Sequence, residues 1–165
     1  MAATRILMVC MGNICRSPTA EGVLRDKLAR AGLAREVLVD SAGTHAQHHN
    51  GEAPDPRAIK AAAARGYDLR RLRARRVVED DYARFDWLFA MDEDNLETLR
   101  ARTPQGATAR VELLMAHGRR FPGVAEIPDP YYGAAAGFER VLDLIEDGCD
   151  GLVSLLLQRN INGTS

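Results

Sequence analysis

Cysteine and aromatic residues are scarce in this 165-residue chain, which has three cysteines and 5% aromatic residues. Three cysteines cannot form a disulfide framework and are typical of proteins from a reducing compartment. No stretch approaches the roughly 18 apolar residues of a membrane span, and the N-terminal segment has no long apolar block of the kind found in signal peptides. We therefore expect a cytoplasmic protein that does not interact with membranes.

An excess of charge of one sign is also lacking, because 22 basic and 23 acidic residues give a net charge of −1. This balance gives no general attraction to nucleic acid, so we expect no nucleic-acid partner. The length suffices for one domain with a real hydrophobic core, and neither an internal repeat nor a linker divides the chain. We expect this domain to span residues 1–159 and residues 160–165 to be a frayed tail.

Apolar segments alternate with helical patterns along the chain. Strand candidates lie at 5–10, 36–41, 86–91 and 110–115, and helix candidates lie at 17–32, 56–66, 92–103 and 135–158. Strand-helix alternation predicts an α/β fold, in which a parallel sheet is covered by helices on both faces. Ligands of such sheets bind at the carboxyl ends of the strands, which is the edge where we expect the functional residues to meet.

The segment 5–22 places a cysteine at the end of an apolar run and an arginine six positions later, directly before a helix start. Gly12 and Asn13 allow a left-handed turn, and Ser17 followed by Pro18 is typical of an N-cap and a first helical residue. The residues between strand and helix are therefore expected to form a tight loop whose N–H groups converge on an anion such as phosphate. The predicted phosphate-binding residues are Met11, Gly12, Asn13, Ile14, Cys15, Arg16 and Ser17.

Cys10 is the predicted nucleophile, because N–H dipoles, a helix N-terminus and a guanidinium all favour the anionic thiolate. Arg16 is the predicted phosphate clamp, since its planar guanidinium can hold two phosphoryl oxygens at once. Ser17 is expected to donate its hydroxyl to the sulfur when the sulfur departs as a leaving group. The loop then transfers a phosphoryl group in two steps. The plainer interpretation, a buried cysteine near a surface arginine, is opposed by the strand, the turn and the helix start around it.

Cleavage of a phosphate ester by a thiolate also needs an acid that protonates the leaving oxygen. Asp129 is the best candidate, because Pro128 and Pro130 stiffen the backbone around it. Tyr131 and Tyr132 are expected to wall a pocket for a flat substrate. The alternative is a proline-bounded turn in which the aspartate is a local cap. Asp92 follows a buried strand, so we expect it to orient the loop or a neighbouring arginine instead.

Several separated motifs resemble the low-molecular-weight protein tyrosine phosphatases over nearly the whole chain. They are Val-Cys-Met-Gly-Asn-Ile-Cys-Arg-Ser-Pro at 9–18, Asp-Ser-Ala-Gly-Thr at 40–44, Ala-Met-Asp at 90–92 with Asn95, and Asp-Pro-Tyr at 129–131. The resemblance implies a single-domain, three-layer fold with a four-stranded sheet in the order 2-1-3-4. It implies Cys10 as nucleophile, Arg16 as clamp and Asp129 as general acid and then base, without a cofactor. Asn13, Ser17 and Ser41, together with Asp92, are the expected braces of the loop.

The resemblance also implies substrates and competitors. Tyrosine-phosphorylated proteins are the expected partners, and inorganic phosphate, vanadate and arsenate are expected to bind as competitors. Ile14 favours phosphotyrosine, since protein arginine phosphatases of this family look like they carry threonine there. A thiol-dependent arsenate reductase shares the fold but needs a downstream cysteine pair, and this chain has only Cys149 downstream. A second alternative is a phosphate-binding module that catalyses no reaction. Such a module would need neither the nucleophile Cys10 nor the acid Asp129.

Two departures from the family pattern affect the site. His48 stands where many members have the aromatic residue that walls the substrate cleft, so His48 is the expected wall here. Leu72 stands where a histidine often supports the bracing side chains, which leaves Asn13, Ser17 and Ser41 as the expected supports.

The remaining cysteines, histidines and arginines allow more than one interpretation. Cys15 either forms a reversible disulfide with Cys10 or is a packing residue, whereas Cys149 is expected in the core. His45, His48 and His49 lack further ligands at suitable spacing, so we expect no metal. The arginines at 70, 71, 73, 75 and 76 are expected to form a solvated face, the alternative being a surface that steers acidic phosphopeptides.

Overall fold

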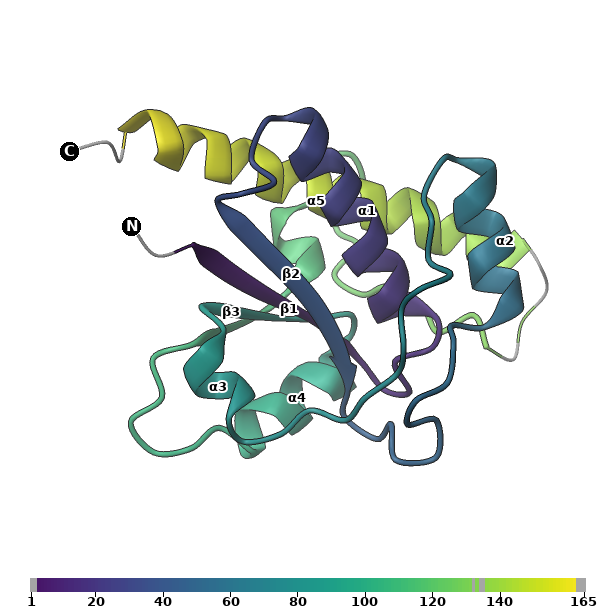
Figure 1. The fold of residues 1–165 in the computed structure, drawn as a ribbon, viewed down its shortest axis with the longest axis horizontal. Coiled ribbons are helices and arrows are strands. Elements are labelled where there is room, and N and C mark those ends of the chain that lie inside the picture. The colour runs from purple at the N-terminus through teal and green to yellow at the C-terminus, as the bar shows by residue number, and fades with distance from the viewer. Residues whose placement is uncertain (1–2, 132, 134–135, 163–165) are drawn as a thin grey trace.

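The computed structural model describes residues 3–131, 133 and 136–162. Its centre is a four-stranded, all-parallel sheet in the order β2-β1-β3-β4, as predicted (Figure 1). The strands are β1 (Thr4–Cys10), β2 (Val37–Gly43), β3 (Trp87–Ala90) and β4 (Arg110–Leu113). Because all four run in the same direction, their carboxyl ends lie at one edge of the sheet.

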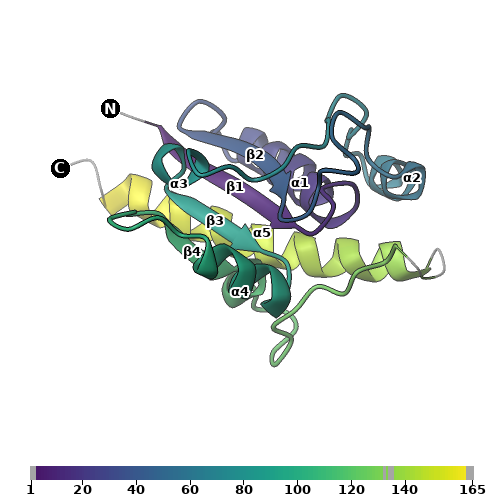
Figure 2. The ribbon, with the colours of Figure 1, turned by 90° about the horizontal axis from the view of Figure 1, so that it is seen from below.

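Helices cover both faces of this sheet, as Figures 1 and 2 show from two directions. One face carries α1 (Arg16–Arg30) and α5 (Ala136–Asn162), and the other carries α3 (Asp81–Arg84) and α4 (Glu93–Ala101). The short helix α2 (Pro56–Ala64) packs on α1 and α5, and a 3₁₀ turn, η1 (Leu114–His117), packs on α5. The predicted three-layer α/β architecture is confirmed.

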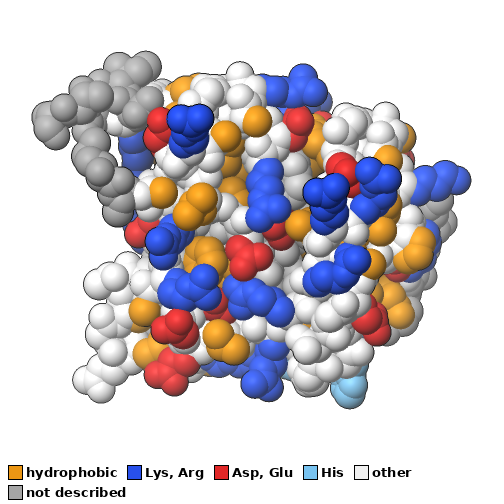
Figure 3. Space-filling view, in the orientation of Figure 1, with side chains coloured by type: hydrophobic (Ala, Val, Ile, Leu, Met, Phe, Trp, Pro, Cys, Tyr) orange, Lys and Arg blue, Asp and Glu red, His pale blue; other side chains and the backbone are white. Residues whose placement is uncertain are grey.

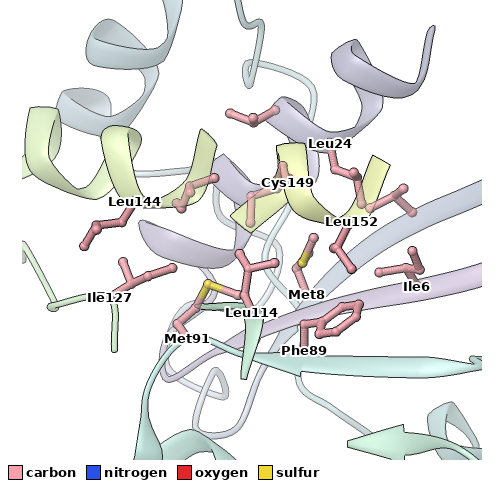
Figure 4. Close-up of a cluster of buried hydrophobic side chains, with 14 of the residues drawn as sticks. Ile6, Met8, Leu24, Phe89, Met91, Leu114, Ile127, Leu144, Cys149 and Leu152 are labelled. Atoms are coloured by element: carbon pink, nitrogen blue, oxygen red, sulfur yellow. The ribbon is translucent and has the colours of Figure 1, made fainter. Parts of the chain in front are cut away.

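Alternate side chains of β1 enter two separate hydrophobic clusters. Ile6 and Met8 pack with residues of α1 and α5, whereas Leu7 and Val9 pack with residues of α3 and α4. Figure 4 shows the first cluster, where Ile6, Met8 and Phe89 from the sheet face Cys149 of α5. A central parallel strand is buried on both faces, which explains why β1 reads as a continuous apolar run.

The element boundaries differ from the predictions in several places. Helix α1 begins at Arg16, so Ser17 is in its first turn and is not its N-cap. The sequence pattern did not predict α3 or η1, which are four residues long each. Helix α5 continues to Asn162, so the expected tail begins inside this helix, and residues 163–165 lie outside the described residues. Within the described part of the chain, we find no helix with the length and apolar character needed to span a bilayer.

Candidate active site

The loop between β1 and α1 follows the last residue of the central strand, Cys10. Asn13 takes the left-handed conformation with φ 57°, whereas Gly12 does not have a positive φ. The carbonyl oxygens of Cys10, Met11 and Ile14 accept hydrogen bonds from the N–H groups of Thr44, His45 and Asp55 at 2.9, 2.8 and 2.8 Å. These hydrogen bonds occupy three of the loop's carbonyl oxygens and hold the loop against the 44–55 segment.

The Cys10 sulfur lies at the floor of this loop and is buried. The Ser17 Oγ is 3.0 Å from Sγ, and the N–H of Asn13 donates to Sγ at 3.3 Å. Ser17 Oγ accepts a hydrogen bond from Asn13 Nδ2 at 2.8 Å. Two acceptors lie within reach of its own proton, the sulfur at 3.0 Å and the Ala42 carbonyl oxygen at 3.4 Å, and the sulfur is the nearer.

Asn13 is the centre of a buried hydrogen-bond network behind the loop. Besides Ser17, its Nδ2 donates to Ser41 Oγ at 3.0 Å, and Ser41 Oγ donates to Glu21 Oε1 at 2.7 Å. Its Oδ1 accepts the N–H of Arg75 at 2.9 Å. The structure therefore brings together Asn13, Ser17 and Ser41, and it adds Glu21 and the Arg75 backbone.

The expectation that only three side chains support the loop is therefore wrong. Leu72 packs against the hydrophobic core, while the N–H of Arg75, three residues later, supplies the missing link from the same segment. Glu21 was missed, although its position four residues after Ser17 on α1 places it on the same helix face. Burial raises the pKa of Glu21, although Ser41 and Arg25 lower it.

The basic stretch at 70–76 is not a uniform solvated face. The guanidinium of Arg75 is half-buried and pairs with Asp40 at 3.0 Å and with the fully buried Asp81 at 3.0 Å. Arg70 is exposed and pairs with Asp68 at 3.0 Å. Figure 3 shows basic and acidic side chains interspersed on the face that this segment crosses. Arg75 is thus a structural support of the loop.

Arg16 is almost fully buried and lines the same cavity as Cys10. Its Nη1 donates to Asp92 Oδ2 at 2.6 Å and to the carbonyl oxygen of Ile127 at 3.0 Å, and its Nη2 lies 3.6 Å from Asp129 Oδ2. Burial lowers the pKa of Arg16, but the Cys10, Asp92 and Asp129 anions raise it above its ordinary value overall. The guanidinium is held in place while remaining charged.

The two aspartates beside Arg16 have different surroundings. Asp92 caps α4, since its Oδ1 accepts the N–H of Asn95 at 2.8 Å, while its Oδ2 pairs with Arg16. Asp129 lines the pocket and is more exposed, with 38% of its side chain accessible against 20% for Asp92. Its Oδ1 accepts the N–H of Tyr131 at 3.1 Å. Of the two carboxylates, Asp129 is therefore the one that borders the cavity.

A cavity of about 150 Å³ opens above the sulfur. It is lined by Cys10, Met11, Gly12, Ile14, Cys15, Arg16, His49, Asp129 and Tyr131. The expectation for His48 is wrong, since His48 is exposed and His49 lines the cavity instead. His49 Nδ1 lies 2.9 Å from Glu52 Oε2, and its ring lies so close to Gly12 that a Cβ there would be 3.3 Å from Cδ2. Tyr132 lies outside the described residues.

The other two cysteines are free thiols in apolar surroundings. Burial raises the pKa of Cys15, and the anions of Asp55, Cys10 and Asp129 raise it further. Cys149 is fully buried in α5, where its sulfur lies 3.9 Å from the Ala20 carbonyl oxygen, and burial raises its pKa too. Cys10 is therefore the thiol on which the site is built.

A larger hollow of about 600 Å³ is lined by residues of 79–83 and 104–108, which include neither a thiol nor an arginine. Among the residues that the structure describes, no group of three or more His, Cys, Asp or Glu side chains is placed to hold a metal.

A parallel α/β fold with a thiol and an arginine in one anion-binding loop, and a carboxylate above them, defines a cysteine-dependent phosphatase. The chain belongs to the low molecular weight phosphotyrosine protein phosphatase family, whose model matches residues 5–162.

Relatives and solved structures agree with this assignment. The low molecular weight phosphotyrosine protein phosphatase of Schizosaccharomyces pombe is 44% identical over 136 residues, which are 81% of this chain and 85% of the relative. The human protein of the same name is 37% identical over 142 residues, covering 85% and 87%. The Entamoeba histolytica protein tyrosine phosphatase, crystallised with Hepes in its active site, superposes with a TM-score of 0.89 at 37% identity, covering 96% of this chain and 99% of that one.

Proposed function

We propose that this phosphatase hydrolyses phosphotyrosine esters of proteins through a phosphocysteine intermediate on Cys10. One observation carries the proposal: Ser17 Oγ and the N–H of Asn13 lie 3.0 and 3.3 Å from the Cys10 sulfur, in a cavity that Arg16 and Asp129 also border. This arrangement places a nucleophile, a cation and an acid around a space that accepts one phosphoryl group.

In the first step, the Cys10 thiolate attacks phosphorus and forms the S–P bond, while the bond from phosphorus to the phenolic oxygen breaks. The Arg16 guanidinium and the loop N–H groups hold the phosphoryl oxygens, whose negative charge they stabilise in the transition state. Asp129, as the carboxylic acid, gives its proton to the departing oxygen, which leaves as a neutral phenol.

In the second step, a water molecule attacks the phosphocysteine and gives its proton to the Asp129 carboxylate. The S–P bond breaks, the electron pair returns to sulfur, and inorganic phosphate is released. Ser17 Oγ at 3.0 Å and the Asn13 N–H at 3.3 Å stabilise the thiolate that departs. Each group returns to its starting protonation state, so the cycle needs no cofactor.

The walls of the cavity support an aromatic ester as substrate. Ile14, His49 and Tyr131 present apolar or flat surfaces to it, and these suit a phenyl ring. Inorganic phosphate and vanadate should compete, because they fill the same anion site. The Entamoeba histolytica relative was crystallised with Hepes, a buffer that carries a sulfonate group, in its active site.

Reduction of arsenate is the less favoured activity for this chain. A relay would have to pass the disulfide from Cys10 to a downstream pair of thiols, yet Cys149 is the one cysteine downstream of the loop and it is fully buried in α5. We place the protein in the cytoplasm, since a reducing compartment keeps a nucleophilic thiol in its active form.

The test is steady-state hydrolysis of p-nitrophenyl phosphate in EDTA by the wild type, Cys10→Ser and Asp129→Asn. We expect activity that resists EDTA, disappears in Cys10→Ser and falls about 100-fold or more in Asp129→Asn, as loss of a general acid predicts. Phosphotyrosine and phosphoarginine substrates then give the specificity, which Ile14→Thr should shift toward phosphoarginine. A wild type without phosphatase activity that reduces arsenate with added thiol would overturn the proposal.

A further inference from the structure

Arg57, the second residue of α2, is bound tightly to the aspartate that caps its own helix. Asp55 Oδ1 accepts the Arg57 N–H at 2.8 Å and Nε–H at 3.1 Å, and Asp55 Oδ2 accepts Nη2–H at 2.8 Å. Arg57 lowers the pKa of Asp55, which keeps this carboxyl ionised. Since the N–H of Asp55 donates to the Ile14 carbonyl oxygen at 2.8 Å, the pair is fixed directly to the phosphate loop.

The guanidinium of Arg57 reaches the segment that contains the acid. Its Nη2 also donates to the Tyr131 carbonyl oxygen at 2.9 Å. The same guanidinium lies 5.7 Å from the Tyr131 ring centroid and 4.9 Å from that of Phe138, at the start of α5. One planar cation therefore contacts the backbone of Tyr131 and the rings of Tyr131 and Phe138.

The backbone of Tyr131 links these contacts to Asp129. Its carbonyl oxygen accepts from Arg57, while its N–H donates to Asp129 Oδ1 at 3.1 Å. With Oδ1 bonded in this way, Asp129 Oδ2 is the oxygen that faces Arg16, at 3.6 Å from Nη2. The orientation of the Asp129 carboxylate thus depends on where Arg57 holds the backbone of Tyr131.

We propose that Arg57 is a positioning residue that couples the phosphate loop to the acid loop and holds Asp129 above the bound phosphoryl group. The inference rests on the proposed function, in which Asp129 is the general acid. Arg57 acts through Asp129 and does not contact the phosphoryl group.

This role predicts a dependence on the leaving group. An acid matters most when the departing phenol has a high pKa and matters little when the phenolate is already stable. Phenyl phosphate has a leaving group of high pKa, and 2,4-dinitrophenyl phosphate has a leaving group that is stable as the phenolate. Because kcat/KM includes the first chemical step, it reports the position of the acid even when hydrolysis of the phosphoenzyme limits kcat.

The experiment compares Arg57→Gln and Arg57→Lys with the wild type on both substrates. We expect kcat/KM for phenyl phosphate to fall about tenfold in Arg57→Gln, a part of the 10²-fold or larger general-acid contribution, and less in Arg57→Lys. For 2,4-dinitrophenyl phosphate we expect a change of less than about twofold. Inhibition by vanadate should be unchanged, because the phosphate loop keeps its own braces.

Arg70 provides a matched control, since it repeats the local pairing of Arg57 away from the acid loop. Asp68 accepts the Arg70 N–H, Nε–H and Nη2–H, each at 3.0 Å, and both side chains are exposed. Arg70→Gln and Arg70→Lys remove the same kind of contacts and should leave kcat/KM unchanged for both substrates.

A double-mutant cycle separates positioning from a general effect on structure. In the Asp129→Asn background, Arg57→Gln should have no further effect on phenyl phosphate. Three outcomes would overturn the role of Arg57 and leave the proposed function intact. They are equal losses of kcat/KM on the two substrates, a loss that adds to that of Asp129→Asn, and loss of vanadate inhibition. An inactive wild type, or a wild type that Asp129→Asn does not impair, would overturn the proposed function together with this inference.

Discussion

At the scale of single residues, Asn13 joins more parts of the site than any other side chain in the described loop. Its amide donates to Ser17 and Ser41, its carbonyl oxygen accepts from Arg75, and its backbone N–H reaches the Cys10 sulfur. Its left-handed backbone, with φ 57°, makes this geometry possible. Asparagine suits the position because it tolerates that conformation better than most residues.

Asn13→Gly isolates the contribution of the side chain, because glycine keeps the left-handed backbone at no steric cost. Loss of the amide network should remove about 2 kcal/mol of transition-state stabilisation, or roughly 30-fold in kcat/KM for an aryl phosphate. Asn13→Ala should lose the same activity and a further ~1 kcal/mol of stability, since its β-carbon opposes the left-handed backbone. A wild-type kcat/KM in Asn13→Gly would show that the network does not support catalysis.

The sequence predicted the local part of the site well. Cys10, Asn13, Arg16 and Ser17 lie within eight residues, so strand, turn and helix signals define their geometry. The supports that it missed come from elsewhere: the Arg75 N–H is 62 positions from Asn13, and a backbone donor leaves no signal in the side-chain pattern. His49 lines the cavity in place of the predicted His48 because it lies in a turn, where side-chain directions follow no regular period that a sequence could reveal.

At the scale of elements, the packing of α5 on η1 depends on glycine. A Cβ on Gly151 would overlap the carbonyl oxygen of His117, and a Cβ on Gly148 would lie 2.8 Å from Leu114 Cγ. The two glycines let the helix backbone approach η1 closely, which places η1 against the core at the end of β4. Because the obstacle at Gly151 is backbone, it cannot be relieved by a change of rotamer.

Gly151→Ala should destabilise the protein by about 2 to 3 kcal/mol, although alanine is the better helix former. Gly137, also on α5, is the matched control, because a Cβ there would make only an ordinary 3.7 Å contact with Pro130. Gly137→Ala should stabilise the protein by about 0.5 kcal/mol through its helix propensity. Urea unfolding measures both, and a neutral Gly151→Ala would mean that η1 moves freely away from α5.

The strands and the longer helices were predictable from sequence because each is long enough to show an apolar run or a helical period. The order of the strands was given by family resemblance, since periodicity alone does not say which strands are neighbours. The four-residue α3 and η1 are too short for a helical period, and tertiary contacts such as the buried Asp81 define them. The end of α5 was placed four residues early, because helix boundaries are the part of an element that sequence patterns define least well.

At the scale of the whole molecule, the buried Glu21 makes stability depend on pH. Burial raises its pKa in the folded state, despite Ser41 and the Arg25 ion pair at 2.7 Å. As pH rises from acid, the unfolded chain therefore releases this proton first, which favours unfolding. This loss of stability is absent at pH values below the pKa of Glu21 in the unfolded chain, and it is complete above the pKa of Glu21 in the folded protein.

Glu21→Gln removes this titration while keeping an oxygen that accepts from Ser41. The stability of the wild type relative to Glu21→Gln should fall as pH rises from about 4 through the raised pKa of Glu21, and then level off. Urea unfolding at a series of pH values measures the difference. Glu97→Gln, which replaces an exposed glutamate of α4, is the control for the loss of one carboxylate. A difference that rises with pH would contradict the argument.

The partners of Arg16 have a consequence for how activity arises during synthesis and folding. This arginine follows the first strand, yet it donates hydrogen bonds to Asp92 and to Ile127, which come 76 and 111 positions later in the chain. The nucleophile therefore leaves the ribosome early, while its clamp stays without these partners until the acid loop has been made and the long chain segments between them have closed. A partly synthesised chain therefore contains the nucleophilic cysteine but has no phosphatase activity. Turnover begins when the acid loop has docked beside Arg16.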